Sequence, residues 1–595
     1  MRQKLIILLA YIFLASWLSS LSLLTLAQIP GMDSTLISTD LLNEKIRIFT
    51  DRSIYAAGEK IFFRIYNLSD PVLKESSWSK ILYVELIDPG NNSPVKGKFP
   101  LEQWGSHGYI TIPSNLRTGN YYLRVYTKWM RNYSPFNYSY SVITIINPYN
   151  EEMNEIFKPG IAKDTISNRY ISKINVIKNF LKCSTGQEKY EKRKKVTLTF
   201  EMPDKTMLSP GGFCISVIKS GATRSNIYGL DLSDLERKEI SSGIKFYPEI
   251  KGISLSGRIV KKDLNIPSAY AEVHLSAPGD HPDYFGYLTD MKGKFFFSLP
   301  GWHETRNFFI GVETKDEDPV EILIDNDFST DLMNLPPIPF ILSVEEKNIA
   351  REIMFNMQLE KAYKQKPHKQ ITDTLAANSN IDVTAVNPES VFFYGNPAYT
   401  LYPADFVDLP SLEEFFLELI PQASVVKRKE GTKILMKGNN PDISIYKPLI
   451  LLDFIPVFNP ENLLKISPES IHRIDIINAT YIRGNMCFGG IISILSKKGD
   501  MAGIDLPENS LFFDFKTFEP QDEIAFPVYS SSAGNKRIPD FRNTMYWNPV
   551  VHGNPGQTIS YDFYTSDNTG DYIVIIRGIS KEGTILEGHC SFTVE

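Results

Sequence analysis

Residues 448–499, PLILLDFIPVFNPENLLKISPESIHRIDIINATYIRGNMCFGGIISILSKKG, decide how the rest of the chain is interpreted. Three apolar runs typical of buried strands occur in this stretch, at 449–452, 471–477 and 491–495. Asp453 marks a turn after the first run, and a short helix is expected over 460–464. Glycines near the end permit positive φ and tight reversals between strands. The pattern predicts a small α+β unit.

The same stretch resembles the plug domain of TonB-dependent outer-membrane receptors, whose pattern is LxxxDGxPV, lsPesIexIevl and YGxxxxGGiIxIxTKkG. The positions that match are Asp453, Pro456, Gly484, Gly489, Gly490, Lys497 and Gly499. The chain departs from the pattern at Phe454, where the family has glycine, and at Ser496, where it has threonine. The resemblance implies a plug-like domain over 385–505, and the two departures bear on gating or ligand binding rather than on the fold.

The length, composition and charge of the chain limit which class of protein it can be. A chain of 595 residues is too long for one core and indicates several domains. Its 43% hydrophobic and 12% aromatic content is that of a folded protein. With 69 acidic and 63 basic residues it lacks the basic excess of a nucleic-acid-binding protein, so no nucleic acid is expected as a partner.

Residues 1–27 have the pattern of a signal peptide. A basic start precedes an apolar run, and Thr25 and Ala27 place small residues where a signal peptidase requires them. Cleavage before Gln28 is expected, which implies export. The resemblance to the plug domain implies the periplasm, or the outer membrane or surface, of a Gram-negative cell. The alternative is an uncleaved anchor, because the run is long enough to span a membrane.

A β-sandwich is expected over 40–147, where short runs alternate between apolar and polar residues. The string TDRSIYAAGEKI at 50–61 resembles the TDkxxYxpGExv signature of alpha-2-macroglobulin-type domains. The matching positions are Asp51, Arg52, Tyr55, Gly58 and Glu59. The resemblance implies either a protease-trap module or an immunoglobulin-like spacer. We favour the spacer, because the Glu-Gln pair at 102–103 lacks the preceding Cys-Gly of that family's thioester.

The remaining chain is expected to form further units. They are a second macroglobulin-like sandwich at 165–235, a β domain at 250–330, a helix at 343–364 and a terminal β-sandwich at 506–595. The string TDMKGKF at 289–295 resembles the TDxxGxF of carboxypeptidase-regulatory-like, transthyretin-type domains. DFRNTMYWNP at 540–549 resembles the C-terminal piece of large exported proteins that join such domains. Polar linkers at 148–164, 234–250 and 365–384 predict separate β-sandwiches along the chain.

Four cysteines are far apart and fit no metal or redox pattern. A bridge between Cys183 and Cys214 and buried free thiols are both considered, the free thiols being preferred. An Asp-rich segment at 325–327 suggests a calcium loop, but the glycine and distal glutamate of that pattern are missing, so an Asx-rich turn is preferred.

Motifs for catalysis are absent from the sequence: it contains no HExxH, no GxSxG and no GxxxxGK[ST]. An enzyme built from scattered Asp, Glu and Tyr would leave no motif. We therefore expect a non-enzymatic envelope scaffold without catalytic, metal-binding or cofactor-binding residues. Its expected partner is a protein of the cell envelope, with an outer-membrane barrel as one candidate. Two alternatives are an accessory component of a TonB-dependent receptor that uses a barrel from another chain, and an envelope protease inhibitor without the thioester.

The plug-like unit is expected to lack a barrel of its own. Only 595 − 499 = 96 residues follow Gly499. A receptor-sized barrel has about 22 strands of about 9–11 residues each, which needs several hundred residues. The sequence therefore predicts that this chain transports nothing alone.

Overall fold

The computed structural model describes residues 43–595 except 70–72, 74–77, 150–174, 204–207, 225–229, 231, 233–243, 263, 280, 315–318, 331–334, 337, 365–391, 430, 439–440, 521 and 530–538. The predicted signal peptide with its cleavage site, and most of the three predicted linkers, lie outside the described residues. Among the described residues, no helix combines the length and apolar character needed to cross a membrane.

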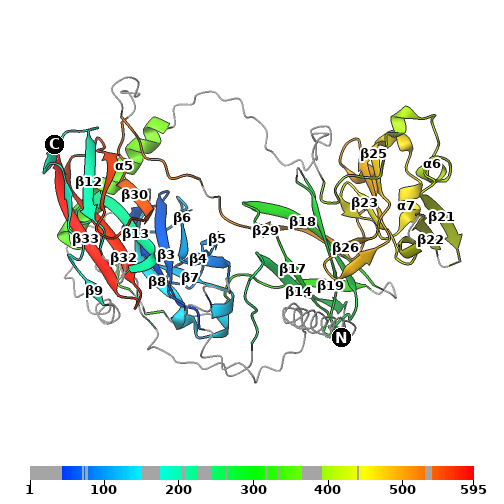
Figure 1. Cartoon of the computed structure of the whole chain (residues 1–595), viewed down its shortest axis with the longest axis horizontal. Coiled ribbons are helices and arrows are strands. Elements are labelled where there is room, and N and C mark those ends of the chain that lie inside the picture. Colours follow the sequence, from blue (N-terminus) through cyan, green and yellow to red (C-terminus); the bar gives the residue numbers. More distant parts are fainter. Residues whose placement is uncertain are drawn as a thin grey trace, which may run out of the picture.

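The chain is mainly β, a multidomain array of β-sandwiches with one small α+β unit, as predicted (Figure 1). The first sandwich has a three-stranded sheet, β1 (Ile46–Thr50), β3 (Lys60–Asn67) and β6 (Gly105–Thr111). Its other sheet has the order β2 (Ile54–Ala56), β8 (Ser139–Ile146), β7 (Gly119–Tyr126), β4 (Ile81–Ile87) and β5 (Val95–Pro100). Alternation along the strands places Ile48, Phe63 and Val84 in its core.

The second sandwich is a composite of two distant segments, which corrects the prediction of separate sandwiches at 165–235 and 506–595. One sheet contains β10 (Cys183–Thr185), β12 (Lys195–Glu201) and β31 (Thr558–Tyr564). The other contains β11 (Lys189–Tyr190), β33 (Ile585–Val594), β32 (Gly570–Ser580), β13 (Leu208–Lys219) and β30 (Thr544–Val551), with β9 (Val176–Ile177) beside β33. In Figure 1 the cyan β12 and β13 lie among the red β32 and β33. Local patterns predicted these strands but carried no information about pairing across more than 300 residues.

The third unit is also completed from the C-terminal segment. One sheet contains β17 (Lys294–Ser298), β14 (Ser254–Lys261) and β19 (Val320–Ile324). The other contains β16 (Asp283–Leu288), β15 (Glu272–Ala277), β18 (Thr305–Glu313) and β29 (Ser510–Lys516). Strand β29 was expected in the terminal sandwich, and the strand expected at 525–529 does not form.

The α+β unit lies at the end of the molecule opposite the composite sandwich (Figure 1). Its sheet has the order β20 (Tyr399–Leu401), β25 (Ile471–Ile477), β28 (Ile491–Ser496), β23 (Leu449–Leu452) and β24 (Ile455–Pro456). Two hairpins, β21 (Ala423–Arg428) with β22 (Gly431–Met436) and β26 (Tyr481–Arg483) with β27 (Met486–Phe488), and two helices, α6 (Leu412–Leu419) and α7 (Pro460–Leu464), accompany it. The Ser-Pro-Glu-Ser segment at 467–470 of the plug-type motif forms a single 3-10 turn, Pro468–Ser470, capped by the Ser467 side chain.

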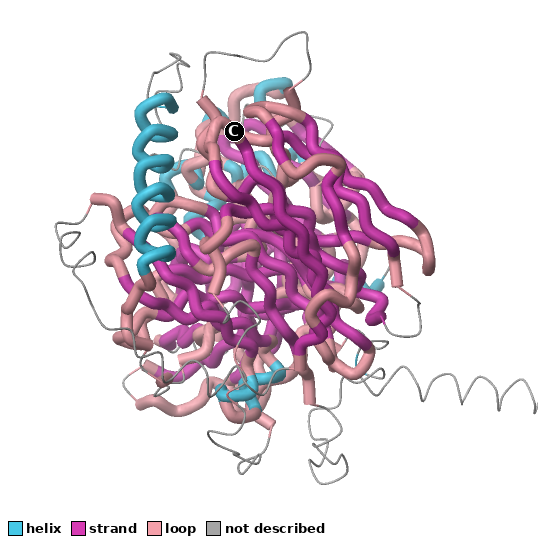
Figure 2. The backbone as a smooth tube through the Cα atoms, turned by 90° about the vertical axis from the view of Figure 1, so that its left-hand side faces the viewer, coloured by secondary structure: helices cyan, strands magenta, loops and turns pink. Residues whose placement is uncertain are grey.

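Helix α5 (Val344–Lys364) joins the first and composite sandwiches, and its prediction is confirmed (Figure 2). The Ser343 hydroxyl accepts a hydrogen bond from the Glu346 amide, and the Glu346 carboxylate accepts one from the Ser343 amide. Ile349 and Ile353 are buried in one cluster with Ile54 of β2 and Ile218 of β13.

The cores are not separate, which corrects the expected string of independent sandwiches. The buried cluster that holds Leu82 and Phe99 of the first sandwich also holds Leu255, Phe308 and Phe515 of the third unit. The bridge considered between Cys183 and Cys214 does not form either. Cys214 is buried in a cluster with Phe49 and Tyr66, whereas Cys183 is partly exposed and packs against the core of the composite sandwich.

Candidate functional site

The densest polar contacts outside the sheets surround residues 540–544, which precede and begin β30; we call this segment and its partners the 540–544 joint. The joint connects the first sandwich, helix α5 and the composite sandwich. Its first contact is with Asp51 of the macroglobulin-type motif. The Thr544 hydroxyl donates to Asp51 Oδ2 at 2.5 Å, and the Tyr55 hydroxyl donates to Asp51 Oδ1 at 2.6 Å.

Asp51 is fully buried, and this burial raises the pKa of its carboxyl group. The neighbouring Arg52 guanidinium and the two hydroxyls oppose that rise. The backbone carbonyl of Asp51 also accepts a 2.6 Å hydrogen bond from the Ser216 hydroxyl on β13. One aspartate therefore ties the first sandwich to two strands of the composite sandwich.

Glu59 forms the second contact. Its Oε1 lies 2.8 Å from the Arg52 guanidinium and accepts a 2.7 Å hydrogen bond from the Asn543 side chain. Its Oε2 accepts from the Ala56 amide at 2.6 Å, which closes the turn that contains Gly58 at φ 97°. The structure thus brings together all five predicted macroglobulin-type positions. Their hydrogen bonds close a turn and connect the first sandwich to the 540–544 segment.

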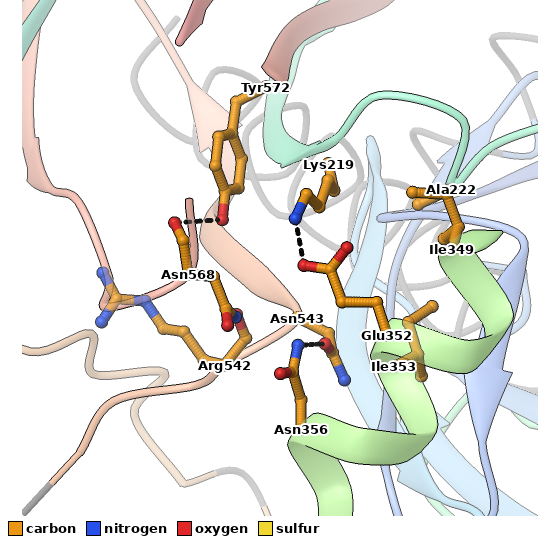
Figure 3. Close-up of a pocket in the computed structure, with 10 residues that line it drawn as sticks. All are labelled: Lys219, Ala222, Ile349, Glu352, Ile353, Asn356, Arg542, Asn543, Asn568 and Tyr572. Carbon is orange, nitrogen blue, oxygen red and sulfur yellow. Dashed lines mark hydrogen bonds and ion pairs between the residues drawn. The ribbon is translucent and has the colours of Figure 1, made fainter. Parts of the chain in front are cut away.

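Asn543 also reaches helix α5, where its Oδ1 accepts a 2.8 Å hydrogen bond from Asn356 (Figure 3). The same wall bounds a small pocket with about 270 Å³ of space, including its open mouth. Lys219 and Glu352 form an ion pair across it. The remaining lining residues are Ala222, Ile349, Ile353, Arg542, Asn568 and Tyr572.

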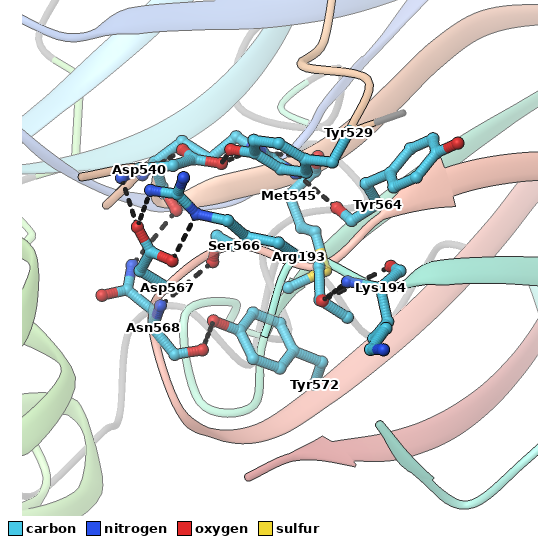
Figure 4. Close-up of polar contacts among 12 residues, drawn as sticks. Arg193, Lys194, Tyr529, Asp540, Met545, Tyr564, Ser566, Asp567, Asn568 and Tyr572 are labelled. Carbon is cyan, nitrogen blue, oxygen red and sulfur yellow. Dashed lines mark hydrogen bonds and ion pairs between the residues drawn. The ribbon is translucent and has the colours of Figure 1, made fainter. Parts of the chain in front are cut away.

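A second group of contacts holds the other end of the joint (Figure 4). The Arg193 guanidinium donates two hydrogen bonds to the Asp567 carboxylate, at 2.8 and 2.6 Å. The Asp540 amide donates a third to Asp567 at 2.7 Å. Although burial opposes it, these bonds lower the pKa of Asp567. Tyr529 donates to Asp540 at 2.6 Å, and burial followed by this bond raises the pKa of Tyr529 to about 12.

The plug-type positions form a separate structural cluster. Asp453 accepts hydrogen bonds from the amide and hydroxyl of Ser496, both at 2.7 Å, and from the Met501 amide at 2.8 Å. Ser496 therefore keeps the hydroxyl that threonine supplies in the family pattern. Phe454 has the positive φ, 66°, that glycine would adopt, and its buried ring packs against Phe392.

Most of the other plug-type positions are explained by the conformation and close packing of the backbone. A Cβ added to Gly484 would lie 2.1 Å from the Gly286 carbonyl oxygen, and one added to Gly489 would lie 2.1 Å from that of Ile443. Gly490 and Gly499 have positive φ, at 98° and 65°. Pro456 pairs with Leu451 in the sheet, and Lys497 is exposed with its amide bonded to Ser470.

The plug-like unit is docked on the third unit through polar contacts. Arg483 reaches Asp283 at 2.5 Å, and the Ser276 hydroxyl donates to the Phe454 carbonyl at 2.5 Å. Lys447 lies 2.5 Å from Glu272 and 2.6 Å from Glu313, which face each other on β15 and β18. This surface of the plug-like unit is therefore covered by another part of the same chain.

Metal-ligating side chains gather at one place in the part of the chain that the structure describes, namely Glu272, His274 and Glu313. Lys447 already supplies a positive charge between the two carboxylates. In the segment considered as a calcium loop, Asp327 pairs with the buried Lys98 at 2.6 Å. The predicted Asx turn is also present, because Asn326 Oδ1 accepts a 3.1 Å hydrogen bond from the Phe328 amide.

The sequence pointed to two of the segments that form the joint. The motifs at 50–61 and 540–549 were both singled out, but the contact between them was not. Arg193, Asn356 and Asp567 were missed, because single polar residues in a loop, a helix and a turn carry no local signal.

Comparisons with known proteins were made for the whole chain. No family model matches it, and no curated protein matches it. Similar solved structures include alpha-2-macroglobulin from Salmonella reacted with methylamine, at 7% identity and a TM-score of 0.22, covering 93% of this chain and 39% of that one. Alpha-2-macroglobulin from Escherichia coli activated by porcine elastase is similar at 10% identity and a TM-score of 0.21, covering 93% and 43%. The chain thus spans about two-fifths of the length of these neighbours.

Proposed function

We propose that the chain is a non-enzymatic scaffold of the Gram-negative cell envelope, associated with the outer membrane, that docks a protein partner through its plug-like unit. The export signal at 1–27 and the plug-type motif support the compartment. The joint and the docked plug-like unit support a scaffold role, because their charged groups hold the units of the chain together.

The observation that carries the proposal is a set of exposed apolar side chains on the plug-like unit. Val407 is 77% exposed, Leu417 is 61% exposed and Tyr399 is 46% exposed. Tyr402 and Phe406 lie between them in sequence and are also exposed. Exposed apolar groups that adjoin one another are typical of a protein-binding surface, and four of these five lie within residues 399–407. We call these five residues the outer apolar set.

The backbone beside this set favours an extended partner. Tyr399 belongs to β20, which pairs with β25 on one side and is the terminal strand of its sheet among the described residues. An edge strand offers main-chain donors and acceptors to an added strand. The partner is thus a protein that offers an extended segment to this edge. The favoured class is an outer-membrane barrel protein, with the added segment lying outside the closed barrel, because a closed barrel has no free edge strand.

A pull-down from detergent-solubilised envelope tests the proposal. The mature chain should retain a defined membrane protein, and the double variant Val407→Glu/Leu417→Lys should lose at least tenfold of it. The matched control is Leu264→Lys/Met291→Glu, which alters equally exposed apolar residues of the third unit and should retain the partner. Equal retention by both variants would refute docking through the outer apolar set. Recovery of a protease instead would favour the inhibitor alternative.

A further inference from the structure

Two of the four cysteines face each other across the composite sandwich. Strands β9 and β33 run parallel, with Val176 opposite Ile585 and Ile177 opposite Leu586. The alignment continues beyond β9, because the Phe180 amide donates to the Glu587 carbonyl at 2.7 Å. Further along, Lys189 of β11 lies opposite Thr593. The chain from 176 to 190 therefore follows β33 in one direction.

Within this alignment Leu181 lies against Gly588. A Cβ added to Gly588 would lie 2.4 Å from the Leu181 carbonyl oxygen and 2.6 Å from the Leu181 Cβ. Side chains two residues apart in extended chain point to the same side. Cys183 and Cys590 each stand two residues further on, Cys183 on β10 of one sheet and Cys590 on β33 of the other, and both side chains pack against the same core cluster.

The thiols are in hydrogen-bond contact. The bond to Cys590, followed by burial, raises the pKa of the Cys183 thiol, and the same bond lowers the pKa of Cys590. The two thiols therefore lie in direct contact. Both side chains are partly exposed, so a thiol reagent has access to them.

We propose that Cys183 and Cys590 form a disulfide that staples the two sheets of the composite sandwich in an oxidising compartment. The inference rests on the export assigned in the proposed function. Cys590 thiolate attacks an oxidised dithiol carrier or oxidised glutathione and forms a mixed disulfide. Cys183 thiolate then attacks the Cys590 sulfur and releases the reduced carrier. The carrier gains two electrons and two protons, and the protein loses them.

The other two cysteines are excluded as partners by position. Cys214 is fully buried on β13 beside Tyr66, and burial raises the pKa of its thiol. Cys487 lies on β27 of the plug-like unit, at the opposite end of the molecule from β33 (Figure 1). Both serve as internal controls.

The experiment uses the mature chain purified under reducing conditions and then equilibrated with oxidised glutathione. After thiol blocking and trypsin digestion, mass spectrometry should recover peptide 183–189 joined to peptide 582–595. Reduction should lower the melting temperature of the composite sandwich by about 5 °C, since a disulfide that closes a long loop constrains the unfolded chain. Cys183→Ser and Cys590→Ser should each abolish the joined peptide and the redox dependence of melting, whereas Cys487→Ser should change neither.

Four free thiols after equilibration, or a joined peptide that contains Cys214 or Cys487, would overturn the pairing. This outcome is independent of the compartment, because the oxidation is carried out on purified protein. If the joined peptide forms in vitro while chain recovered from cells has four free thiols, the proposed export is refuted and the pairing stands.

Discussion

The hydroxyl of Thr544 lies 2.5 Å from the carboxylate of Asp51, although 493 positions separate the two residues in the sequence. This contact joins the macroglobulin-type motif of the first sandwich to the strand that completes the composite sandwich. Both residues are buried, so each would leave a polar partner unsatisfied if the other were removed. The two motifs that the sequence displays separately are therefore one structural element in the folded chain.

Thr544→Val should destabilise the chain by about 1–3 kcal/mol, the usual cost of an unsatisfied buried acceptor. Denaturant unfolding followed by intrinsic fluorescence would measure it. The matched control is Thr197→Val, which removes an exposed hydroxyl bonded to Asp562 at 2.7 Å and should change the free energy of unfolding by less than about 0.5 kcal/mol. Equal effects from both variants would show that Asp51 does not depend on Thr544.

Ser496→Thr should fold like the original chain, because it keeps the hydroxyl that donates to Asp453. Ser496→Ala should lower the free energy of unfolding of the plug-like unit by about 1–3 kcal/mol, since Asp453 is buried and would lose one donor. Hydrogen exchange of the Asp453–Met501 region would separate the two. Similar protection in both variants would contradict the assigned role of the hydroxyl.

Stability should depend on pH through Glu44. Burial raises the pKa of this carboxyl group to about 7, with the charge of Glu249 adding to the rise. The folded chain then binds a proton that the unfolded chain has released, so the stabilisation is fully present below the usual pKa of about 4.5 and is lost as the pH rises through 7. Glu44→Gln should flatten the melting temperature between pH 4.5 and 7. An unchanged slope would assign the dependence to other groups.

Lys447→Gln should loosen the docking of the plug-like unit on the third unit, because Glu272 and Glu313 would face each other without a cation. The groups are about two-fifths exposed or less, so screening limits the effect to roughly 1 kcal/mol and makes it smaller in high salt. Hydrogen exchange at β15 and β18 should increase. Lys427→Gln removes a comparable ion pair with Glu413 on α6 and should leave that exchange unchanged.

The mature chain in liposomes should pass no solute on its own. Strands β29 to β33 are all paired within the third unit and the composite sandwich. Dye-release measurements with protein-free liposomes as the control would test this. Flux that rises with the amount of chain would contradict it.

The sequence by itself determined the kind of element at most positions. Alternating runs predicted β1, β3, β4, β7 and β8, and the capping box at Ser343 predicted α5, because these signals depend on neighbours within a few residues. The motif at 448–499 predicted the turn at Asp453 and positive φ at its glycines for the same reason, and Gly484 and Gly490 have φ of 66° and 98°.

Tertiary structure alone decided which strands share a sheet. β13 pairs with β30 and β32, and β18 pairs with β29, although the plug-like unit lies between the partners in the sequence. Hydrogen bonds between strands join backbone groups that almost every residue carries. The amino-acid sequence of one strand therefore does not specify which other strand pairs with it. The joint could not be predicted for a related reason. The hydrogen bonds of Asp51, Asn356 and Thr544 form only when folding brings distant segments together and excludes water from their polar groups.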